Sequence, residues 1–268
     1  MAIHYRTKGF IFKKSDRFEA DRLFKIFTYD FGKIEILARA IRKITSKLRT
    51  GADIFYLSDI EFIQGKTYKT LTDAIVLEKF ARIKKSLKKL KISHKISRVL
   101  DNLLKGEEHD ENIWQLLDEV FTILNEAGHY SMVYYFFLWN FFSILGYKPE
   151  VYKCALCQKK LMPYKLYFSD KEGGVICHAC SRNASPHTFP ALRFAQLNES
   201  LCSKGVGARG LVKINTDVVK ILRMIFKKDW KILSKIKVEP LSKKTLKDIS
   251  EGYYSYLLDI YSPRKGIM

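Results

Sequence analysis

Four cysteines carry the most specific chemical pattern in this sequence of 268 residues. Cys154 and Cys157 form one Cys-x-x-Cys pair, and Cys177 and Cys180 form a second pair after nineteen intervening residues. Two residues between the sulfurs let one tight turn place both thiolates on the same ion, and the second pair completes a tetrahedron. The pattern therefore predicts one structural zinc ion, because four sulfur ligands leave no open position for catalysis.

Other uses of these cysteines are disulfides, a redox pair or reduced thiols in a core. The N-terminus alternates polar and apolar residues without the apolar core of a signal peptide, so we expect a cytoplasmic environment that disfavours disulfides. A redox pair normally lies between a strand and a helix, a setting that we do not expect here. His178 could replace one cysteine as a ligand, and Cys202 is expected to be a small buried side chain.

The charge balance indicates a polyanionic partner. Lys and Arg number 48 against 28 Asp and Glu, which gives a formal net charge of +20. Hydrophobic residues make up 47% of the chain, enough for a folded core. Residues 132–145 are almost all apolar, but this run is shorter than the ~20 residues of a membrane span. We expect a buried core helix of the second domain there, and no contact with a membrane.

The elements that position these residues change type near residue 80. Before it, short runs rich in Ile, Phe, Tyr and Thr alternate apolar with polar residues, which is typical of strands. Five strands in so short a segment favour a small closed barrel, because closure removes exposed strand edges. The expected strands are 9–13, 23–28, 33–39, 54–63 and 69–74.

After residue 80, apolar residues recur every three to four positions, as in amphipathic helices. In the lysine-rich run 84–91 we expect Leu87 and Leu90 to face inward and the lysines to face solvent. Ser242 is expected to cap the last helix. The sequence thus predicts a multidomain α+β protein, with a barrel over residues 1–80 and a helical domain over residues 81–268. A zinc-binding insertion over residues 151–183 interrupts the helical domain.

Two basic clusters could hold a polyanion. The first is a loop after the third strand that contains no acid and fits phosphate groups, although a merely solvated loop explains it as well. The second surrounds a tryptophan and suits an acidic peptide with an apolar end as well as nucleic acid. The loop residues are Arg39, Arg42, Lys43, Lys47 and Arg49, and the second cluster comprises Lys227, Lys228, Trp230 and Lys231. Aromatic residues that could stack on bases are Phe10, Phe12, Tyr29, Phe31, Tyr56 and Tyr68.

Signals for catalysis are weak. The segment Gly65-Lys66-Thr67 lacks the upstream glycine of a phosphate-binding loop, and no His-Glu-x-x-His motif occurs. We therefore expect no enzyme activity and no nucleotide cofactor. A metal-assisted nuclease is one alternative, in which Asp16, Glu19 and Asp21 would gather around metal ions. An RNA- or ribosome-binding factor with a zinc ribbon is another.

Several ordered motifs resemble the bacterial recombination mediator family RecO. They run through nearly the whole chain and are strongest over residues 17–75 and 137–180. The matching segments are Glu19-Ala20-Asp21-Arg22-Leu23, Phe27-Thr28, Gly32-Lys33-Ile34, Ala38-Arg39, Arg42-Lys43, Ser46-Lys47-Leu48, Leu71-Thr72-Asp73-Ala74, Leu145-Gly146-Tyr147-Lys148-Pro149, the four cysteines and Gly173-Gly174. The chain departs from the family pattern at Ala40, where glycine is usual, and at Ala52-Asp53.

The resemblance implies an OB-fold barrel and a helical domain with a zinc ribbon, in a mediator that is not an enzyme. Such a protein binds single- and double-stranded DNA, anneals complementary strands without ATP, and acts with RecR to replace the single-stranded-DNA-binding protein by RecA. It would be cytoplasmic and associated with the nucleoid. The resemblance adds Arg22 and Lys33 to the barrel residues expected to bind DNA. It also implies that the acidic tail of the single-stranded-DNA-binding protein binds the second basic cluster.

Overall fold

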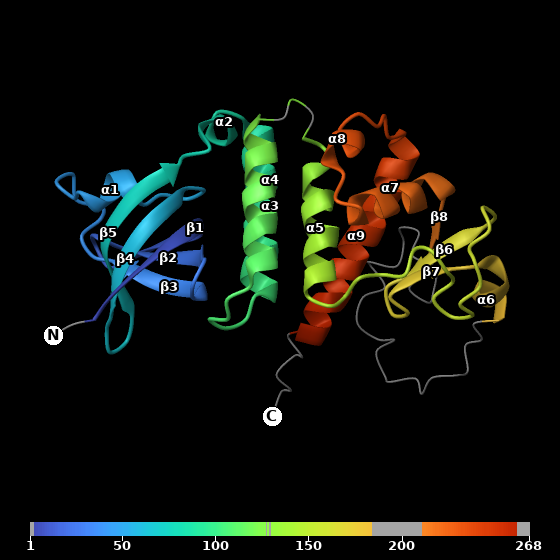
Figure 1. Ribbon diagram of the computed structural model, residues 1–268, viewed down its shortest axis with the longest axis horizontal. Helices are drawn as coiled ribbons and strands as arrows, with labels where there is room; N and C mark the ends of the chain where they lie inside the picture. The colour runs from blue at the N-terminus through green and yellow to red at the C-terminus, as the bar shows by residue number, and fades with distance from the viewer. Residues whose placement is uncertain (1–2, 127, 129, 184–210, 262–268) are drawn as a thin grey trace. The chain divides into compact units, whose positions relative to one another are not determined.

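The structure, a computed structural model, describes residues 3–126, 128, 130–183 and 211–261 (Figure 1). Cys202 lies outside the described residues. The contacts divide the chain into two compact units, Met1–Phe137 and Leu138–Met268. The expected domain boundary at residue 80 follows the end of the last barrel strand at Glu78 and stays a prediction about independent folding.

Five strands form a closed barrel in the first unit, as the sequence predicts. They are β1 (His4–Arg17), β2 (Asp21–Thr28), β3 (Gly32–Ala38), β4 (Leu57–Gln64) and β5 (Lys69–Glu78). The order around the barrel is β1-β2-β3-β5-β4, with β3 and β5 parallel and β1 closing antiparallel on β4. This order is that of an OB-fold barrel. The strands differ from the expected ranges at their ends, most of all in β1, which is longer in both directions.

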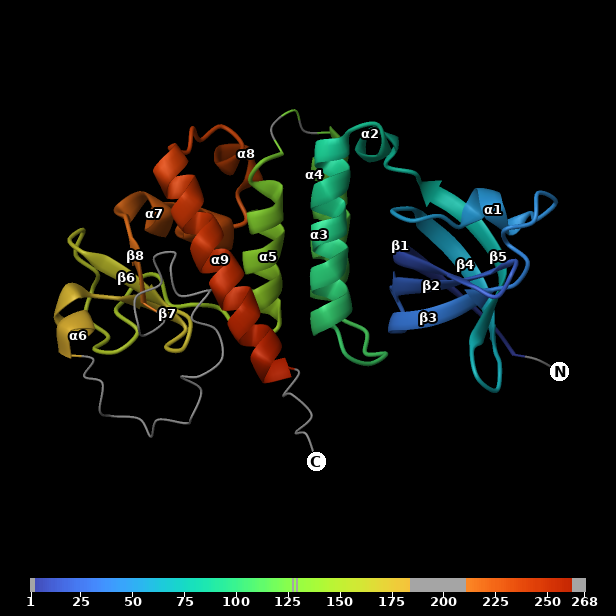
Figure 2. The same ribbon diagram turned by 180° about the vertical axis from the view of Figure 1, so that it is seen from behind.

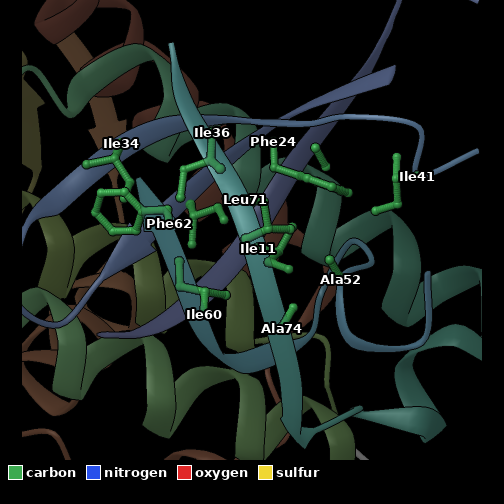
Figure 3. Close-up of a cluster of buried hydrophobic side chains, with 12 residues drawn as sticks. Ile11, Phe24, Ile34, Ile36, Ile41, Ala52, Ile60, Phe62, Leu71 and Ala74 are labelled. Atoms are coloured by element: carbon green, nitrogen blue, oxygen red, sulfur yellow. The ribbon is translucent and has the colours of Figure 1, made fainter. Parts of the chain in front are cut away.

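The barrel core follows from the alternation of apolar and polar residues along each strand. Alternate side chains of one strand point into the barrel, so that every second residue is apolar and buried. Figure 3 shows how these side chains from different strands meet in one cluster. The cluster contains Ile11, Phe24, Ile26, Ile34, Ile36, Ala38, Ile41, Ala52, Ile60, Phe62, Leu71 and Ala74. Burying each large side chain of this kind stabilises the fold by about 1.5–3 kcal/mol.

The outward face of the barrel carries a second apolar layer. Phe10 neighbours Ile11 of the core and therefore points out of the barrel, yet it is only 3% exposed. Its ring lies 5.0 Å from that of Trp114 and 5.7 Å from that of Phe121. Both partners belong to α4 (Glu111–Glu126), which with α3 (Leu87–Leu103) covers this part of the barrel. The barrel and these helices therefore share one compact unit.

An ion cluster fastens α3 to three lysines of the barrel strands. The carboxylate of Asp101 lies 2.6 Å from Nζ of Lys13, 2.7 Å from that of Lys25 and 3.3 Å from that of Lys33. Lys33 also donates to the carbonyl oxygens of Asp101 and Leu104, at 2.8 and 2.9 Å. These carbonyls end α3, where unpaired backbone acceptors favour a cation. The lysines therefore supply partners both for the backbone carbonyls at the end of α3 and for the carboxylate of Asp101.

The expected orientation of the lysine-rich run is wrong at Leu87 and Lys89, although Leu90 is partly buried and Lys85, Lys88 and Lys91 are exposed as expected. Leu87 is 77% exposed, whereas Lys89 is 8% exposed and its ammonium donates to the carbonyl of Asn125 at 2.9 Å. The reason is a break in the helix: α2 (Ala81–Lys84) ends, and Ser86 caps α3 by accepting from the backbone of Lys89. The new helix start turns Leu87 to solvent.

The second unit is built around aromatic side chains. The predicted apolar helix is α5 (Val133–Ile144), whose Trp139 is fully buried and stacks on Tyr253 at 5.4 Å. The indole N–H of Trp139 donates to the hydroxyl of Ser250, which satisfies its polar atom. The other helices are α6 (His178–Asn183), α7 (Thr216–Phe226), α8 (Trp230–Leu233) and α9 (Pro240–Tyr261). No helix in the described ranges is long and apolar enough to span a membrane.

The expected cap of the last helix is also wrong. Helix α9 begins at Pro240, two residues before Ser242, because proline suits the first helical position. Ser242 is buried and accepts a hydrogen bond from the side chain of Asn215 at 2.8 Å. Asn215 itself caps α7 by accepting from the backbone N–H of Val218. Ser242 therefore joins two helices instead of starting one.

The Asp101 cluster generates a prediction about stability. Burial raises the pKa of Asp101, but hydrogen bonds from Lys13 and Lys25 outweigh it and hold the pKa at about 2. A carboxyl with a depressed pKa stabilises the fold above its unfolded pKa of about 4, and this contribution disappears as the pH falls toward 2. We expect Asp101→Asn to lower the free energy of unfolding at pH 7 by about 1–2 kcal/mol, allowing for solvent screening.

Urea unfolding at a series of pH values measures this difference. The difference in the free energy of unfolding between the wild type and Asp101→Asn should shrink as the pH falls from about 4 to 2. The control is Asp118→Asn, which changes an exposed aspartate of α4 and should behave like the wild type. An Asp101→Asn gap that stays constant with pH would show that the carboxylate charge does not stabilise the unit.

Candidate metal centre and nucleic-acid interface

The four cysteines lie at one end of a small sheet. Strands β6 (Leu166–Ser169) and β7 (Gly174–Ile176) form a hairpin within the predicted insertion (Figure 2). A third strand, β8 (Leu211–Ile214), pairs with β6 and lies beyond the predicted insertion of residues 151–183. Its four residues gave too short a signal for the sequence analysis. Cys154 and Cys157 precede the hairpin, and Cys177 follows β7 directly.

The four sulfur atoms are close enough to share one ion. All four Sγ atoms lie within 4.8 Å of one another, and those of Cys157 and Cys177 are 3.9 Å apart. The cluster contains thiols only, and such soft ligands favour zinc, copper(I) or iron–sulfur centres over calcium or magnesium. This geometry supports the prediction that both Cys-x-x-Cys pairs bind the same metal ion.

Backbone groups prepare Cys154 to be a thiolate ligand. Burial raises the pKa of this thiol, but the N–H groups of Cys157, Cys177 and Leu156 outweigh the burial and lower the pKa to about 6. Burial, together with hydrogen bonds to the other cysteines, raises the pKa of Cys180 to about 12. Four neighbouring thiolates repel one another unless a cation lies between them. The cluster therefore needs a metal ion to deprotonate all its ligands.

His178 lies beside the cluster but is not one of its members. It follows Cys177, and its ring packs against those of Tyr164 and Tyr167. Its Nδ1 atom is buried and makes no hydrogen bond within the described part of the chain. The geometric ligand set consists of the four cysteines and leaves this histidine out.

The basic loop of the barrel, residues 39–49, is held at both ends. At its start, the backbone N–H of Ala40 donates to the carboxylate of Asp21 at 2.7 Å. At its end, the loop runs into α1 (Leu48–Gly51), which packs on β5 so closely that a Cβ on Gly51 would stand 1.7 Å from the carbonyl oxygen of Ala74. The loop therefore presents its side chains from fixed anchor points. All five expected cations are exposed: Arg39, Arg42, Lys43, Lys47 and Arg49.

Two apolar side chains of this surface escaped the sequence analysis. Phe18 is 81% exposed in the turn between β1 and β2, and Ile44 is 91% exposed in the basic loop. The guanidinium of Arg42 donates to the carbonyl of Glu19, which brings the turn and the loop together. The signal that could have revealed Phe18 is its position in a polar turn, between Arg17 and Glu19. We call Phe18, Ile44 and the five loop cations the barrel-loop surface.

Comparison with known proteins now identifies the family. The model described as "Recombination protein O N terminal" matches residues 1–80, and "Recombination protein O C terminal" matches residues 85–198. The chain belongs to the recombination protein O family. This confirms the resemblance noted in the sequence and places the chain among proteins of DNA repair and recombination.

Relatives of this family match over most of their length. A protein of Dehalococcoides mccartyi named DNA repair protein RecO is 28% identical over 236 residues, which cover 85% of this chain and 93% of the relative. Proteins of the same name from Halalkalibacterium halodurans and Moorella thermoacetica are 24% and 25% identical and cover 93% and 95% of this chain. The matches cover 88% and 86% of those two relatives.

The two barrel residues that the RecO resemblance added have partners inside the protein. Lys33 is bound to Asp101 and Leu104, and burial lowers its pKa. Its side chain is 14% exposed, so that a phosphate could reach it only by breaking these contacts. Arg22 is paired with Asp16 at 2.8 Å and is partly buried. We therefore centre the candidate interface on the loop and leave Lys33 out.

The expected stacking residues separate into buried and accessible groups. Phe10 and Phe12 are 3% and 2% exposed and belong to the interior of the unit. Tyr29 and Tyr68 are 39% and 38% exposed, while Phe31 and Tyr56 are partly buried. Phe18 is more exposed than any of these six rings. Of the six candidate rings, Phe10 and Phe12 are therefore core residues, and Tyr29 and Tyr68 are the most accessible.

The carboxylates of the nuclease alternative do not form a metal-holding group. Asp16 pairs with Arg22, and Asp21 accepts from the backbone of Ala40. The cysteine cluster is the one group in the described residues whose ligand atoms are close enough for a metal ion. The geometry gives no support to a site built from Asp16, Glu19 and Asp21.

The second basic cluster lies where α7 ends and α8 begins. Lys227, Lys228 and Lys231 are exposed, whereas Trp230 is partly buried as the first residue of α8. Ile232, two residues further on, is 53% exposed. The cluster thus combines cations with accessible apolar area on one short segment.

The metal centre generates a prediction about ion content. We expect the purified chain to bind one metal ion, and Cys154→Ser to weaken metal binding at least a hundredfold because it removes the most buried ligand. Elemental analysis after dialysis against a weak chelator measures this loss. The matched comparison is His178→Asn, which should retain the ion since His178 is outside the ligand set. Loss of the ion from His178→Asn alone would contradict this ligand assignment.

Proposed function

We propose that this RecO-family protein is a recombination mediator that binds single- and double-stranded DNA on its barrel-loop surface. It anneals complementary strands without ATP, and with RecR it replaces the single-stranded-DNA-binding protein by RecA on the bacterial nucleoid. The observation that carries this proposal is the group of five exposed cations on one anchored loop without an acidic residue among them. Family membership supports the DNA repair part of the proposal.

The chemistry of the barrel-loop surface fits DNA in two ways. Its cations neutralise phosphates and release counterions, which lowers the repulsion between two strands brought to one protein. Its exposed ring, Phe18, offers a face on which an unpaired base can stack. Neither step consumes ATP: base pairing between the strands drives annealing, and the protein accelerates it by lowering the repulsion between them.

The metal of the cysteine cluster is zinc in this proposal. Zinc–sulfur bonds of about 2.3 Å in a tetrahedron place neighbouring sulfurs about 3.8 Å apart. The distance of 3.9 Å between the sulfurs of Cys157 and Cys177 fits this value. Bound zinc would crosslink the two Cys-x-x-Cys segments and leave no open coordination position for catalysis. Cys154 and Cys157 hold the start of the insertion, and Cys177 and Cys180 hold the segment that leaves β7.

The partner site for the tail of the single-stranded-DNA-binding protein is placed on the second basic cluster. An acidic peptide would meet the exposed ammonium groups of Lys227, Lys228 and Lys231. Its apolar end would pack beside Trp230 and the exposed side chain of Ile232. Such a contact would recruit the protein to DNA that is already coated with the single-stranded-DNA-binding protein.

Annealing of complementary oligonucleotides coated with the single-stranded-DNA-binding protein tests the main proposal. Without ATP, the wild type should accelerate annealing, and the effect should fade steeply with salt. Reversal of Arg39, Arg42, Lys43 and Lys47 to Glu should weaken DNA binding by about 10–100-fold and flatten its salt dependence. The physical reason is the loss of four phosphate contacts.

The control reverses four other exposed lysines of the same unit: Lys79, Lys85, Lys88 and Lys91. This variant changes the net charge by the same amount as the barrel-loop reversal and should retain most of the affinity for DNA. Equal losses in both variants would mean that total charge matters and that the barrel loop is not the site. A wild type that prefers structured RNA to single-stranded DNA of equal length would overturn the mediator function in favour of an RNA-binding factor.

Binding of a tail peptide to the full chain tests the partner site. We expect Trp230→Ala combined with Lys228→Ala to weaken binding of an acidic, apolar-ended peptide by about tenfold, because both the apolar contact and a charge are lost. Fluorescence anisotropy of a labelled peptide at low salt measures the affinity. The comparison variant changes Lys243 and Lys244 of α9, which are exposed lysines outside the cluster. Unchanged binding by the Trp230 variant would move the peptide site elsewhere.

A further inference from the structure

The metal-binding insertion carries a basic and aromatic surface of its own. Between Val151 and Ser169 the sequence contains no Asp or Glu. Four lysines and two tyrosines of this stretch are exposed, with exposed fractions of 44% for Tyr152 and 60% for Tyr164. We call these residues the ribbon surface: Tyr152, Lys153, Lys159, Lys160, Tyr164 and Lys165. Neither the cysteine site nor the barrel loop includes them.

The metal-binding turn fixes the positions of three of these lysines. The backbone N–H of Cys154 donates to the carbonyl of Lys159 at 2.9 Å, so that a metal ligand is hydrogen-bonded to the lysine backbone. Lys153 and Lys160 face each other in an isolated antiparallel bridge on the two arms of the turn. A bound ion holds the turn closed, and the turn holds the three cations on one short segment.

Cations also orient the two tyrosine rings. The guanidinium of Arg223 lies 5.0 Å from the ring centre of Tyr152 and is itself anchored by two hydrogen bonds to the carbonyl of Val151. The ammonium of Lys165 lies 5.1 Å from the ring centre of Tyr164. Cation–π contacts of this kind restrict the rings before any ligand arrives, which reduces the entropy lost on binding.

We infer that the ribbon surface is a second contact site for single-stranded nucleic acid. Cations interleaved with exposed aromatic rings match a ligand that alternates phosphates with unpaired bases. Duplex DNA offers the same phosphates but keeps its bases stacked, so the tyrosines discriminate in favour of single strands. A chain with two such surfaces can contact two strands at once, or two segments of one strand. This inference rests on the proposed function only for the identity of the nucleic acid as DNA.

Binding of the full, metal-loaded chain to oligothymidylate across a salt series tests the cations. Three substitutions, Lys153→Ala, Lys159→Ala and Lys160→Ala, remove three cations. They should make the plot of log affinity against log salt less steep by about 2, because each phosphate contact to a single strand contributes about −0.7 to its slope. Affinity at moderate salt should fall about tenfold. The control removes Lys235, Lys243 and Lys244, three exposed lysines of the same unit that lie outside the ribbon surface.

Two substitutions of Tyr164 test the stacking step. Tyr164→Ala should weaken single-strand binding by at least fivefold and leave duplex binding unchanged, whereas Tyr164→Phe keeps the ring and should retain the affinity. Ultraviolet crosslinking of the oligonucleotide should recover peptides that contain Tyr152 or Tyr164. Metal content, measured for every variant, shows that the turn is intact.

The outcomes separate this inference from the main proposal. If the ribbon variants bind like their lysine control while the barrel-loop reversal loses DNA, the ribbon site is wrong and the proposed function stands. If the ribbon variants instead lose an acidic peptide and keep DNA, the surface docks a protein and the inference is overturned. Loss of single-strand affinity in the ribbon variants, together with retention by Tyr164→Phe, supports it.

Discussion

The ion cluster around Asp101 decides which surface of the barrel remains available. OB-fold barrels commonly bind oligonucleotides on the face of their second and third strands. Here Lys25 of β2 and Lys33 of β3 point outward from that face, and both are bound to Asp101 of α3. Two cations that could have met phosphates therefore hold a helix instead. In the proposed function, the loop after β3 therefore binds the nucleic acid, since the helices of this unit leave its cations exposed.

In the second unit, the cysteine cluster lies where both the stability of the small sheet and the position of nearby lysines are decided. A hairpin of four- and three-residue strands buries too little apolar surface to be stable alone. The pairing of β6 with β8 enlarges this small core, and a metal ion held by the four cysteines would stabilise it further. The turn that carries Cys154 and Cys157 also positions Lys153, Lys159 and Lys160. Structure and surface chemistry are thus coupled in one short segment.

Much of this arrangement could be predicted from the sequence, for identifiable reasons. Apolar and polar residues alternate along the strands with a period of two, so the barrel and most of its core could be inferred. The spacing of the cysteines indicated which four residues form the candidate metal site. The partner of Lys33 could not be inferred, because Asp101 is 68 residues away and no local pattern links them. The same holds for Lys89, whose burial depends on where Ser86 restarts the helix. Strand β8 has only four residues and lies far from its partner β6 in the chain.

Ala40 shows how the resemblance and the geometry complement each other. The sequence departs from the RecO pattern here, where glycine is usual. The structure gives Ala40 a φ of 51°, in the left-handed region that glycine adopts without strain. Alanine pays roughly 1 kcal/mol for this conformation. The hydrogen bond from its N–H to Asp21 stabilises the bend, so the basic loop keeps its anchor despite the substitution.

The distribution of ion pairs supports the proposal that phosphates bind at the loop. On the strands, Arg6, Lys14 and Arg22 are matched by Asp59, Asp53 and Asp16. In the described ranges, no ion pair joins Arg39, Lys43, Lys47 or Arg49 to a carboxylate, whereas Arg42, the fifth loop cation, lies 3.8 Å from a carboxylate oxygen of Asp16. A phosphate that approaches one of these three strand cations must displace a carboxylate and lose that favourable contact. A phosphate that approaches Arg39, Lys43, Lys47 or Arg49 releases only solution counterions, which is entropically favourable. The strand cations with carboxylate partners stabilise the fold, and in the proposed function the loop cations without such partners bind the ligand.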